Sequence, residues 1–488
     1  MSKRTIITSI ILSILTACNN TSHNYNLYKI EVDGKIGYIN KYGEEIISPQ
    51  YIYSTDFNDG LALVVTDTLY TNNPNKICYK YNYINVNNKK QFKDDLSIKP
   101  SIVLYIFARN DKRLITDWLE NFNYNCGLAV NQAIQTERNS EILYGYIDLK
   151  GNIVIPHKYR KCTPFSENKA FVQQSTNDFF DEVIKTNSSI ILSDHKNKWK
   201  IIDKTGKSLT EYIFSDYNNQ QPFPFVNNRT IGFIAVNENG KLKYTANLID
   251  ENCNVIKTLP NIGEEFSNLM NNAGFFNLAE LADAWKYGLD LTINDGIITQ
   301  SSGALSGFGQ NSKFYNANDG TYLPTIPELS NKERMEILSD SLFILDLIEN
   351  NLYVTYSKGF SEGVAPCTYI RFADNNQTRG GKWFFVNKHM AVMGKKGETN
   401  VFDDAEPFSD GMAAIMNNGK WGYINRKFDL VIPCQYDIAY PFINGLAKVE
   451  TNGKSLTISS YINKSGNVIW QNINYTDPQI LHDIKSKE

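Results

Sequence analysis

The clearest copy of a recurring pattern begins at Gly422-Tyr423-Ile424-Asn425 and continues through Ile432-Pro433 and Tyr436 to Phe442-Ile443-Asn444-Gly445-Leu446-Ala447. Two earlier segments align with it without gaps: Gly37-Tyr38-Ile39-Asn40 through Tyr51 to Phe57-Asn58-Asp59-Gly60-Leu61-Ala62, and Gly145-Tyr146-Ile147-Asp148 through Tyr159 to Phe165-Ser166-Glu167-Asn168-Lys169-Ala170. In all three, 11 residues separate the Asn or Asp from the Tyr (51−40, 159−148, 436−425), and 6 separate that Tyr from the Phe (57−51, 165−159, 442−436). Two spacings kept three times predict one supersecondary unit repeated along the chain.

Weaker copies fill much of the remaining sequence. The opening strand recurs at Tyr83-Ile84-Asn85, Ile201-Ile202-Asp203, Leu248-Ile249-Asp250, Phe385-Val386-Asn387 and Tyr461-Ile462-Asn463, with a degenerate copy from Phe314-Tyr315-Asn316 through Gly320 to Leu323-Pro324. The closing element recurs at Tyr124-Asn125-Cys126-Gly127-Leu128-Ala129, Phe360-Ser361-Glu362-Gly363-Val364-Ala365 and Phe408-Ser409-Asp410-Gly411-Met412-Ala413. Near the C-terminus the opening strands lie 38 residues apart twice (425−387, 463−425), a spacing that indicates a repeat array.

Turn-forming residues predict how each repeat folds. Asn-Gly and Asp-Gly accept the positive φ angles of a type I′ turn, and they precede opening strands at Asp33-Gly34, Asn239-Gly240, Asn418-Gly419 and Asn452-Gly453. The closing strand of one repeat should therefore pair with the next opening strand. A second turn leads into a strand that we expect to end at its Pro, because Pro lacks the N–H that pairing needs. A single hairpin is marginally stable, so neighbouring copies must share a core, into which the recurring Phe is expected to insert.

The segment Gly419-Lys420-Trp421-Gly422-Tyr423-Ile424-Asn425, with the Ile-Pro and Phe elements that follow, resembles the WG repeat family. Trp421-Gly422 is the one full Trp-Gly pair; the Trp place is filled elsewhere by Ile36, Tyr144, Trp199 and Trp383, and the Gly is replaced by Lys200 and Phe384. The resemblance covers about residues 28–260 and 310–470 and is weakest over 65–130 and 240–330. It implies a bacterial protein, commonly of the cell envelope, and no particular reaction.

The pattern lapses in the middle of the chain. Apolar residues between Phe266 and Trp285 fall at helix-like spacing, although Gly274 weakens that pattern. A second helix is expected from Ser330, where Glu333 completes a capping box, and residues 343–356 are expected to form two strands. We interpret residues 263–356 as an insertion that caps or bridges two β-arrays. The alternative is a functional insertion, since binding sites often lie in loops on a rigid scaffold.

The N-terminus predicts export. Lys3 and Arg4 precede the apolar run 5–15, which is too short to span a bilayer and is typical of a secretory signal peptide. Leu15-Thr16-Ala17-Cys18 resembles a bacterial lipobox, which implies cleavage before Cys18 and acylation of that residue. Each buried methylene contributes about 0.8 kcal/mol, so several acyl chains would anchor the chain to a membrane. No Asp follows Cys18, which favours the outer membrane; an ordinary signal peptide with an incidental Cys is the alternative.

Signatures of other chemistry are missing from the sequence. The formal net charge is −3 and no long basic run occurs, so a nucleic-acid partner is not expected. The five His do not lie near one another or near Cys at metal-ligand spacings, and no nucleophile elbow or phosphate-binding loop is present. We therefore expect no metal, cofactor or catalytic residues. The six Cys after Cys18 leave two possibilities, disulfides or buried thiols, and their spacing does not assign pairs.

Three tryptophans that occupy the Trp place, Trp199, Trp383 and Trp421, are candidate contact residues. They are expected to be core wedges, since the same place also takes other apolar residues. The alternative is an exposed ladder that stacks on sugars or grips a peptide.

The sequence thus predicts a mainly β chain, an array of antiparallel β-hairpin repeats that is curved or solenoid-like, with a β-propeller as the alternative and an α-containing insertion. The expected divisions are a signal peptide (1–17), a tether (18–27), N-terminal repeats (28–262), the insertion (263–356), C-terminal repeats (357–475) and a tail (476–488). The function expected is non-enzymatic binding or scaffolding of an envelope protein or glycan, with the lipid anchor as the membrane contact. The rivals are an envelope enzyme with its site in the insertion and a structural envelope component without a discrete ligand.

Overall fold

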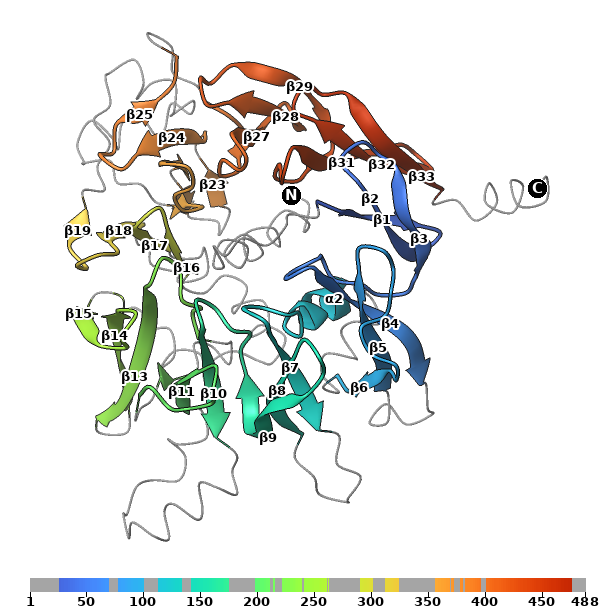
Figure 1. Cartoon of the computed structure of the whole chain (residues 1–488). Helices are drawn as coiled ribbons and strands as arrows, with labels where there is room; N and C mark the ends of the chain where they lie inside the picture. Colours follow the sequence, from blue (N-terminus) through green and yellow to red (C-terminus); the bar gives the residue numbers. More distant parts are fainter. Residues whose placement is uncertain are drawn as a thin grey trace, which may run out of the picture. The chain divides into compact units, whose positions relative to one another are not determined.

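The computed structural model describes residues 26–69, 78–100, 113–133, 142–174, 198–210, 214–215, 222–238, 241–260, 262, 290–301, 312–323, 356–368, 370–372, 378–380, 382–395 and 401–475. The chain divides into two compact units, an N-terminal unit, Ile14–Thr258, and a C-terminal unit that includes Leu259–Glu488. Within the described ranges, both units consist of small antiparallel sheets, so the predicted mainly β class is confirmed (Figure 1). Whether the array is open or closes into a propeller stays a prediction.

The N-terminal unit shows four sheets in its described part, in each of which neighbouring strands follow one another along the chain (blue to green in Figure 1). They are β1 (Tyr28–Val32), β2 (Lys35–Ile39) and β3 (Glu45–Tyr51); β4 (Leu61–Leu69), β5 (Cys78–Asn85) and β6 (Leu96–Ile98); β7 (Leu128–Ala133), β8 (Leu143–Asp148), β9 (Ile153–Cys162), β10 (Lys169–Gln174), β11 (Lys198–Asp203) and β12 (Phe214–Ser215); and β13 (Thr230–Glu238), β14 (Lys241–Ile249) and β15 (Val255–Leu259).

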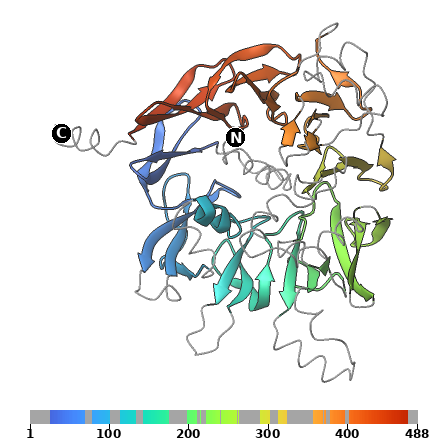
Figure 2. The same ribbon diagram turned by 180° about the vertical axis from the view of Figure 1, so that it is seen from behind.

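The C-terminal unit shows five sheets among its described residues, and the same meanders are seen from behind in Figure 2. They are β16 (Asp290–Asn294), β17 (Ile297–Ser301), β18 (Lys313–Asn316) and β19 (Tyr322–Leu323); β20 (Tyr356–Ser357), β21 (Val364–Thr368), β24 (Phe384–Asn387) and β25 (Val392–Met393); β22 (Ile370–Phe372) and β23 (Thr378–Gly380); β26 (Asp404–Ala405), β27 (Met412–Asn417), β28 (Lys420–Asn425) and β29 (Leu430–Tyr436); and β30 (Ile438–Ala439), β31 (Leu446–Asn452), β32 (Leu456–Asn463) and β33 (Val468–Tyr475).

Closing and opening strands pair as predicted, with Met412 opposite Asn425 and Asn417 opposite Lys420 in β27 and β28. Asn418 and Gly419 have φ angles of 51° and 74°, as a type I′ turn requires, and Asp33-Gly34 adopts the same turn. The prediction is wrong at Asn452-Gly453. There Asn452 pairs with Thr457, and neither Asn452 nor Gly453 has a positive φ, so these two residues do not form a type I′ turn. Asn239-Gly240 lies outside the described residues.

The closing element is itself a two-residue turn with positive φ, which the sequence pattern had marked only by its Gly. Both central residues have φ between 49° and 98° in eight copies among the described residues: Asp59-Gly60, Cys126-Gly127, Glu167-Asn168, Asn227-Asn228, Asp295-Gly296, Glu362-Gly363, Asp410-Gly411 and Asn444-Gly445. The flanking residues pair across each turn. Asn, Asp and Gly recur here because they tolerate this left-handed conformation.

The Asn or Asp that ends each opening strand caps the second turn. Its Oδ1 accepts the N–H groups two and four residues later at 2.7–3.1 Å in eight described copies: Asn40, Asn85, Asp148, Asp203, Asp250, Asn387, Asn425 and Asn463. A short carbonyl or carboxylate side chain is what such a turn needs. The recurring Asn or Asp is therefore a structural residue.

We call the strand that follows the capped turn and pairs with the opening strand, such as β29, the outer strand. The glycine of the Trp-Gly place faces a bulge in this strand. In β28 and β29, Tyr423 pairs with Ile432 and Trp421 pairs with Tyr436. An advance of two residues along β28 therefore corresponds to four residues along β29. A Cβ atom on Gly422 would lie 2.5 Å from the carbonyl oxygen of Ile432, so any side chain there would force the backbone to shift. The other two gapless copies share this register shift and this crowding.

This bulge corrects the expectation that the strand ends at its Pro. β29 contains Pro433 and continues to Tyr436, as β3 continues past Pro49 and β9 past Pro156. Proline is tolerated at a bulge, because the missing N–H is not needed where the ladder is already interrupted.

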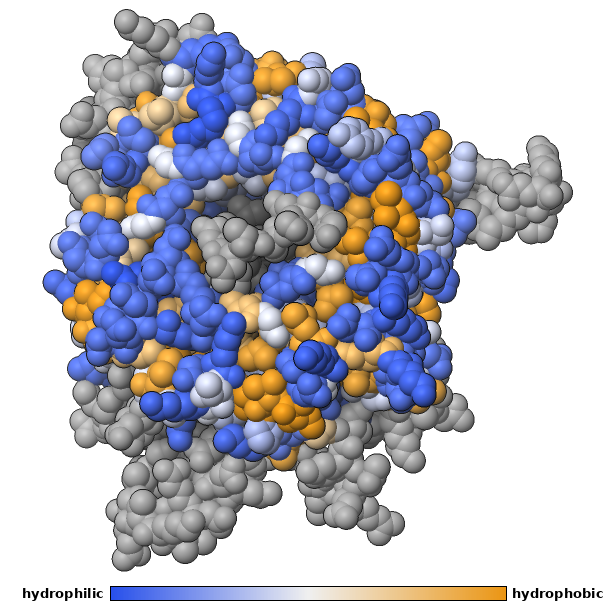
Figure 3. All heavy atoms as spheres, in the orientation of Figure 1, coloured by the Kyte–Doolittle hydropathy of each residue, from blue (hydrophilic) through white to orange (hydrophobic). Residues whose placement is uncertain are grey.

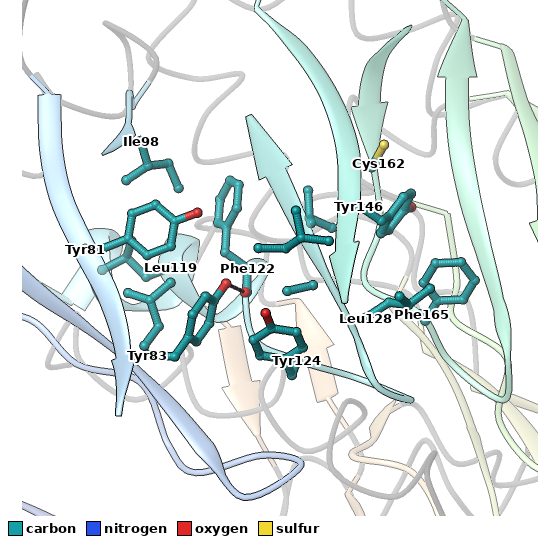
Figure 4. Packing of buried hydrophobic residues seen from close by; sticks show 14 of the residues in the cluster. Tyr81, Tyr83, Ile98, Leu119, Phe122, Tyr124, Leu128, Tyr146, Cys162 and Phe165 are labelled. Carbon is teal, nitrogen blue, oxygen red and sulfur yellow. Dashed lines mark hydrogen bonds between the residues drawn. The ribbon is translucent and has the colours of Figure 1, made fainter. Parts of the chain in front are cut away.

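The opening-strand Tyr and the closing Phe form the core of each clear copy. The rings of Tyr38 and Phe57 lie 4.9 Å apart, and those of Tyr423 and Phe442 lie 4.8 Å apart, in edge-to-face contact. Figure 4 shows the equivalent Tyr146 and Phe165 in the large N-terminal cluster. Each Tyr hydroxyl donates to a backbone carbonyl 17 residues later at 2.6–2.9 Å, so its burial leaves no unsatisfied donor.

The middle of the chain contains more of the repeat than predicted. Strands β16 to β19 form one four-stranded sheet, and the degenerate opening strand at Phe314 is present with its turn. Asp295-Gly296 is a closing turn that the sequence pattern missed, because Ile293 replaces the Phe. Both predicted helices fall outside the described residues. The structure adds α2 (Arg113–Glu120), which buries Ile115 and Leu119.

Candidate functional site

Two of the three candidate tryptophans are core residues. Trp199 is 0% exposed and Trp421 is 6% exposed, and each packs in a separate hydrophobic cluster. Each of the two tryptophans pairs with a residue of the adjacent strand. Ile36 and Tyr144 occupy the same place in other repeats and pair in the same way. These two side chains therefore do not form an exposed ladder.

Trp383 is half-buried and lies beside a charged cluster. Lys358 Nζ lies 4.5 Å from the centre of its ring, and the same ammonium bonds Asp404 Oδ1 and Glu406 Oε1, each at 2.8 Å. We call these four residues the Lys358 cluster. The three charged side chains are only 11–15% exposed.

Repeat geometry explains why these charges meet. Lys358 and Glu406 each stand two residues before the closing Phe of their own repeat, so they occupy the same place in successive repeats. Burial alone would lower the pKa of Lys358, but the adjacent Glu406 and Asp404 carboxylates outweigh burial and raise it. Burial raises the pKa of Glu406. Because the ammonium and the carboxylates satisfy one another, the cluster acts as an ionic anchor between two sheets.

Other carboxylates hold the closing turns of successive repeats together. The acid at the first turn position accepts the N–H of the second turn residue in the next repeat at 2.5–3.0 Å: Asp59 from Gly127, Glu167 from Asn228, Asp295 from Gly363, Glu362 from Gly411 and Asp410 from Gly445. We call these contacts turn clasps. They account for the acid in the recurring Phe-Ser-Asp-Gly.

A second clasp joins repeats at their opposite ends. Asp437 bonds Lys420 Nζ at 2.7 Å and accepts the N–H of Asn452 at 2.8 Å. Asp403 makes the equivalent contacts with Lys382 and with the N–H of Asn418. These hydrogen bonds outweigh burial and lower the pKa of both carboxyl groups. The Lys of the Lys-Trp pair is therefore a structural residue as well.

Exposed apolar side chains recur at one place in the repeat. Among the described residues 15 large apolar side chains are exposed, and nine of them stand five or six positions after the turn-capping Asn or Asp: Ile46, Ile153, Val154, Leu209, Val255, Tyr322, Leu430, Val431 and Val468. We call these nine the outer-strand row, because they lie at or beside the start of the outer strand. In Figure 3, hydrophobic patches lie scattered among hydrophilic ones.

The row departs from the alternation of a half-buried strand. Successive side chains point to opposite faces, yet both members of Ile153-Val154 are exposed, at 58% and 40%, and so are both members of Leu430-Val431, at 53% and 38%. Isolated exposed apolar residues are ordinary. A place that is apolar and exposed in seven repeats is a candidate contact surface.

The family described as "WG containing repeat" matches residues 36–70, 144–175, 401–421 and 421–454. The chain carries WG repeats at these four segments, which together span about a quarter of its length. Three of the four segments coincide with the gapless copies, which are the copies with a Gly under the outer-strand bulge. No curated protein matches the sequence.

Solved structures resemble the chain only distantly. Dipeptidyl peptidase 4 from Porphyromonas gingivalis has 9% identity and a TM-score of 0.35, over 95% of this chain and 60% of that one. Acylaminoacyl peptidase from Pyrococcus horikoshii has 10% identity and a TM-score of 0.30, over 84% and 57%. Sqt1 from Chaetomium thermophilum, bound to the N-terminus of ribosomal protein L10, has 8% identity and a TM-score of 0.29, over 87% and 96%. The chain thus spans less than two thirds of the two peptidases, and likenesses this weak carry no conclusion.

The cysteines, possible metal ligands and possible membrane spans can also be examined in the described residues. The six cysteines after Cys18 are free thiols, with Cys162 and Cys367 buried. No group of three or more His, Cys, Asp or Glu could hold a metal within the described ranges. The same part of the chain contains no helix long and apolar enough to cross a membrane. Cys18 lies outside the described residues.

Sequence reasoning missed both the Lys358 cluster and the outer-strand row. Counting back two residues from each closing Phe would have aligned Lys358 with Glu406. Counting forward from each capping Asn or Asp would have shown the row, since Val, Ile or Leu recurs there.

Proposed function

We propose that the protein is an exported lipoprotein, anchored through acylated Cys18, whose WG repeats bind another envelope protein without catalysing a reaction. The observation that carries the binding role is the outer-strand row. Apolar side chains at one place in several repeats of each unit suit an extended apolar partner, because each such repeat adds one more contact of the same kind. A protein fits better than a glycan, since sugars are usually held by aromatic faces and two of the three candidate tryptophans are buried.

The contacts of the recurring acidic residues support a scaffolding role, because these residues bond other parts of the array. The described acids that recur in the repeat are bonded to backbone N–H groups or to lysines of neighbouring repeats. Such carboxylates rigidify the array. An extended binding surface benefits from this rigidity, because less ordering is needed when the partner binds.

The binding role is tested with an Ile153→Glu/Leu430→Glu double variant in an envelope pull-down. Both positions are more than half exposed, so the fold should tolerate the change while an apolar contact would be lost. Ile473→Glu is the matched control, because Ile473 is 41% exposed but lies outside the row. We expect a partner recovered by wild type and control and lost from the double variant. Equal recovery by all three would contradict the proposal.

Anchoring is tested separately with Cys18→Ser. We expect wild type in the membrane fraction with incorporated fatty acid, and the variant released without label. A labelled or membrane-bound Cys18→Ser protein would refute acylation at this residue.

The enzyme alternative needs a narrower test than removal of residues 263–356, since β16 to β19 belong to the repeat array. Replacing residues 263–289 with a Gly-Ser linker spares these strands. Hydrolase activity in wild type that disappears in this variant, with partner recovery unchanged, would favour an enzyme.

A further inference from the structure

The last sheet of the chain ends in an edge strand that lacks the usual protection. β33 pairs with β32 and is the final strand of its sheet in the described part of the chain (red in Figure 1). Its eight residues, Val468–Tyr475, include neither a charged residue nor a proline, and five of them are exposed while none is buried. An edge strand presents backbone N–H and C=O groups that can pair with another strand, so proteins commonly blunt it with Lys, Pro or a bulge, or keep it short.

The final strands of the other eight sheets in the described ranges are blunted in these ways. β3 and β29 contain a proline and a register shift, and β15 contains Lys257. β6, β12, β19, β23 and β25 have only two or three residues. β7, which is an uncharged edge strand at the start of its sheet, is buried along five of its six residues. β33 is therefore unusual in being a long, uncharged edge that is open to solvent.

Most of β33 is also regular enough to accept an added strand. Its one register shift lies near its start, and from Trp470 to Tyr475 each residue pairs in step with Tyr461 to Leu456 of β32. Strand addition to a sheet edge relies on such an uninterrupted row of backbone groups. Residues 470–475 thus offer six consecutive residues for pairing.

The side chains of residues 470–475 suit a second copy of the same strand. In antiparallel pairing over these six residues, Trp470 lies opposite Tyr475 of the second copy, and Gln471 lies opposite Asn474. Aromatic pairs across strands are favourable, and side-chain amides both donate and accept hydrogen bonds. Like charges that face one another destabilise a strand pair, and an uncharged strand brings none when it meets its own copy.

We propose that β33 pairs antiparallel with β33 of a second copy of this chain, which joins two four-stranded sheets into one continuous sheet. Each copy contributes the same surface, so the contact is isologous and closes at two copies. The opposite edge of this sheet, β30, has only two residues, which prevents further growth by the same means. The pairing goes beyond the binding role proposed above and does not depend on it, because residues 470–475 lie outside the outer-strand row.

The test is co-capture of two differently tagged full-length copies from detergent-solubilised cells. Wild-type copies should be recovered together. A Gln471→Lys/Asn474→Lys variant replaces two exposed side chains of β33 and places lysines opposite one another. We expect its co-capture to fall at least about tenfold, because like charges placed across an interface disfavour association. Gln435→Lys is the matched control, since Gln435 is exposed on β29, which Pro433 already blunts; its co-capture should equal that of wild type.

A charge-swap experiment separates lost pairing from lost folding. When the Lys variant is expressed with a Gln471→Glu/Asn474→Glu variant, opposite charges face each other, so co-capture should return at least to the wild-type level. If the double variants do not fold, single changes serve instead. Gln471→Lys in one copy should then associate poorly with Asn474→Lys in the other and well with Asn474→Glu.

Three results would overturn the proposal. The first is the absence of co-capture between wild-type copies, and the second is co-capture that the lysines do not reduce. The third is a Lys and Glu combination that associates no better than the Lys variant with itself. Recovery of a different protein that the lysines displace, in place of the second copy, would also rule out this occupant.

Discussion

Replacing Gly422 with Ala should break the register between β28 and β29. The new Cβ would lie 2.5 Å from the carbonyl oxygen of Ile432 and 2.7 and 2.8 Å from backbone atoms of Cys434 and Pro433. All three neighbours are backbone atoms, so no side-chain rotation can relieve the contact. The outer strand must move away, and the pairing of Trp421 with Tyr436 is then weakened.

The change in the free energy of unfolding expected for Gly422→Ala is the balance of two opposing effects. Forcing one methyl group into a packed site costs about 1–3 kcal/mol, and the lower entropy of an unfolded chain with Ala returns about 0.4–1 kcal/mol. A net loss of about 1–2 kcal/mol in the free energy of unfolding is expected. Ser460 provides the control, because it occupies the Gly place of the last repeat, where the ladder runs through Ser460–Gln471 without a bulge. Ser460 is buried but already carries a Cβ, so Ser460→Ala adds no atom against the outer strand and should cost about 1 kcal/mol or less.

Urea unfolding followed by circular dichroism and tryptophan fluorescence measures both variants. Gly37→Ala and Gly145→Ala should resemble Gly422→Ala, since backbone crowds all three glycines in the same way. If Gly422→Ala unfolds at the same urea concentration as wild type, or if Ser460→Ala loses as much stability, then crowding by the bulge is not what requires the glycine.

Three further outcomes are expected. Asp410→Ala removes a turn clasp and an ion pair, and should cost about 1–2 kcal/mol in urea unfolding, with part of the loss shared with Lys464→Ala in a double-mutant cycle. Tyr423→Phe leaves the carbonyl of Tyr440 without its 2.7 Å donor and should cost about 1 kcal/mol by the same measurement. Asp437 has a lowered pKa, so its stabilisation is present above the ordinary carboxyl pKa of 3.8 and is lost as the pH falls below it; the melting temperature of Asp437→Asn should therefore decline less on acidification than that of wild type.

Much of the fold could be predicted because each repeat residue has a local reason. The turn-capping Asn or Asp, the Gly of the closing turn and the Tyr–Phe pair each act within one repeat. Their spacing is therefore fixed by the backbone and visible in the sequence. The pairing of Met412–Asn417 with Lys420–Asn425 followed from Asn418-Gly419 alone.

Features that depend on contacts between repeats were not predictable in the same way. Lys358 and Glu406 meet because two repeats stack, and nothing near either residue marks the contact. The turn clasps were hidden likewise, since acids on exposed turns are ordinary in solvent-facing sequence. The closing turn at Asp295 was missed because the pattern relied on Phe, whereas the backbone requires only the positive φ angles that Asp-Gly supplies.

The glycine of the repeat is more diagnostic than the tryptophan. In the gapless copies the Trp place takes Ile36, Tyr144 or Trp421, and each pairs with the Tyr of the outer strand, so any large apolar side chain serves. The Gly place is different. It is Gly where the bulge crowds it, Ser460 where the ladder passes it without a bulge, and Asn82 where the side chain itself bonds the backbone of Phe92, in the segment before β6. The identity of this residue therefore reports the path of the outer strand.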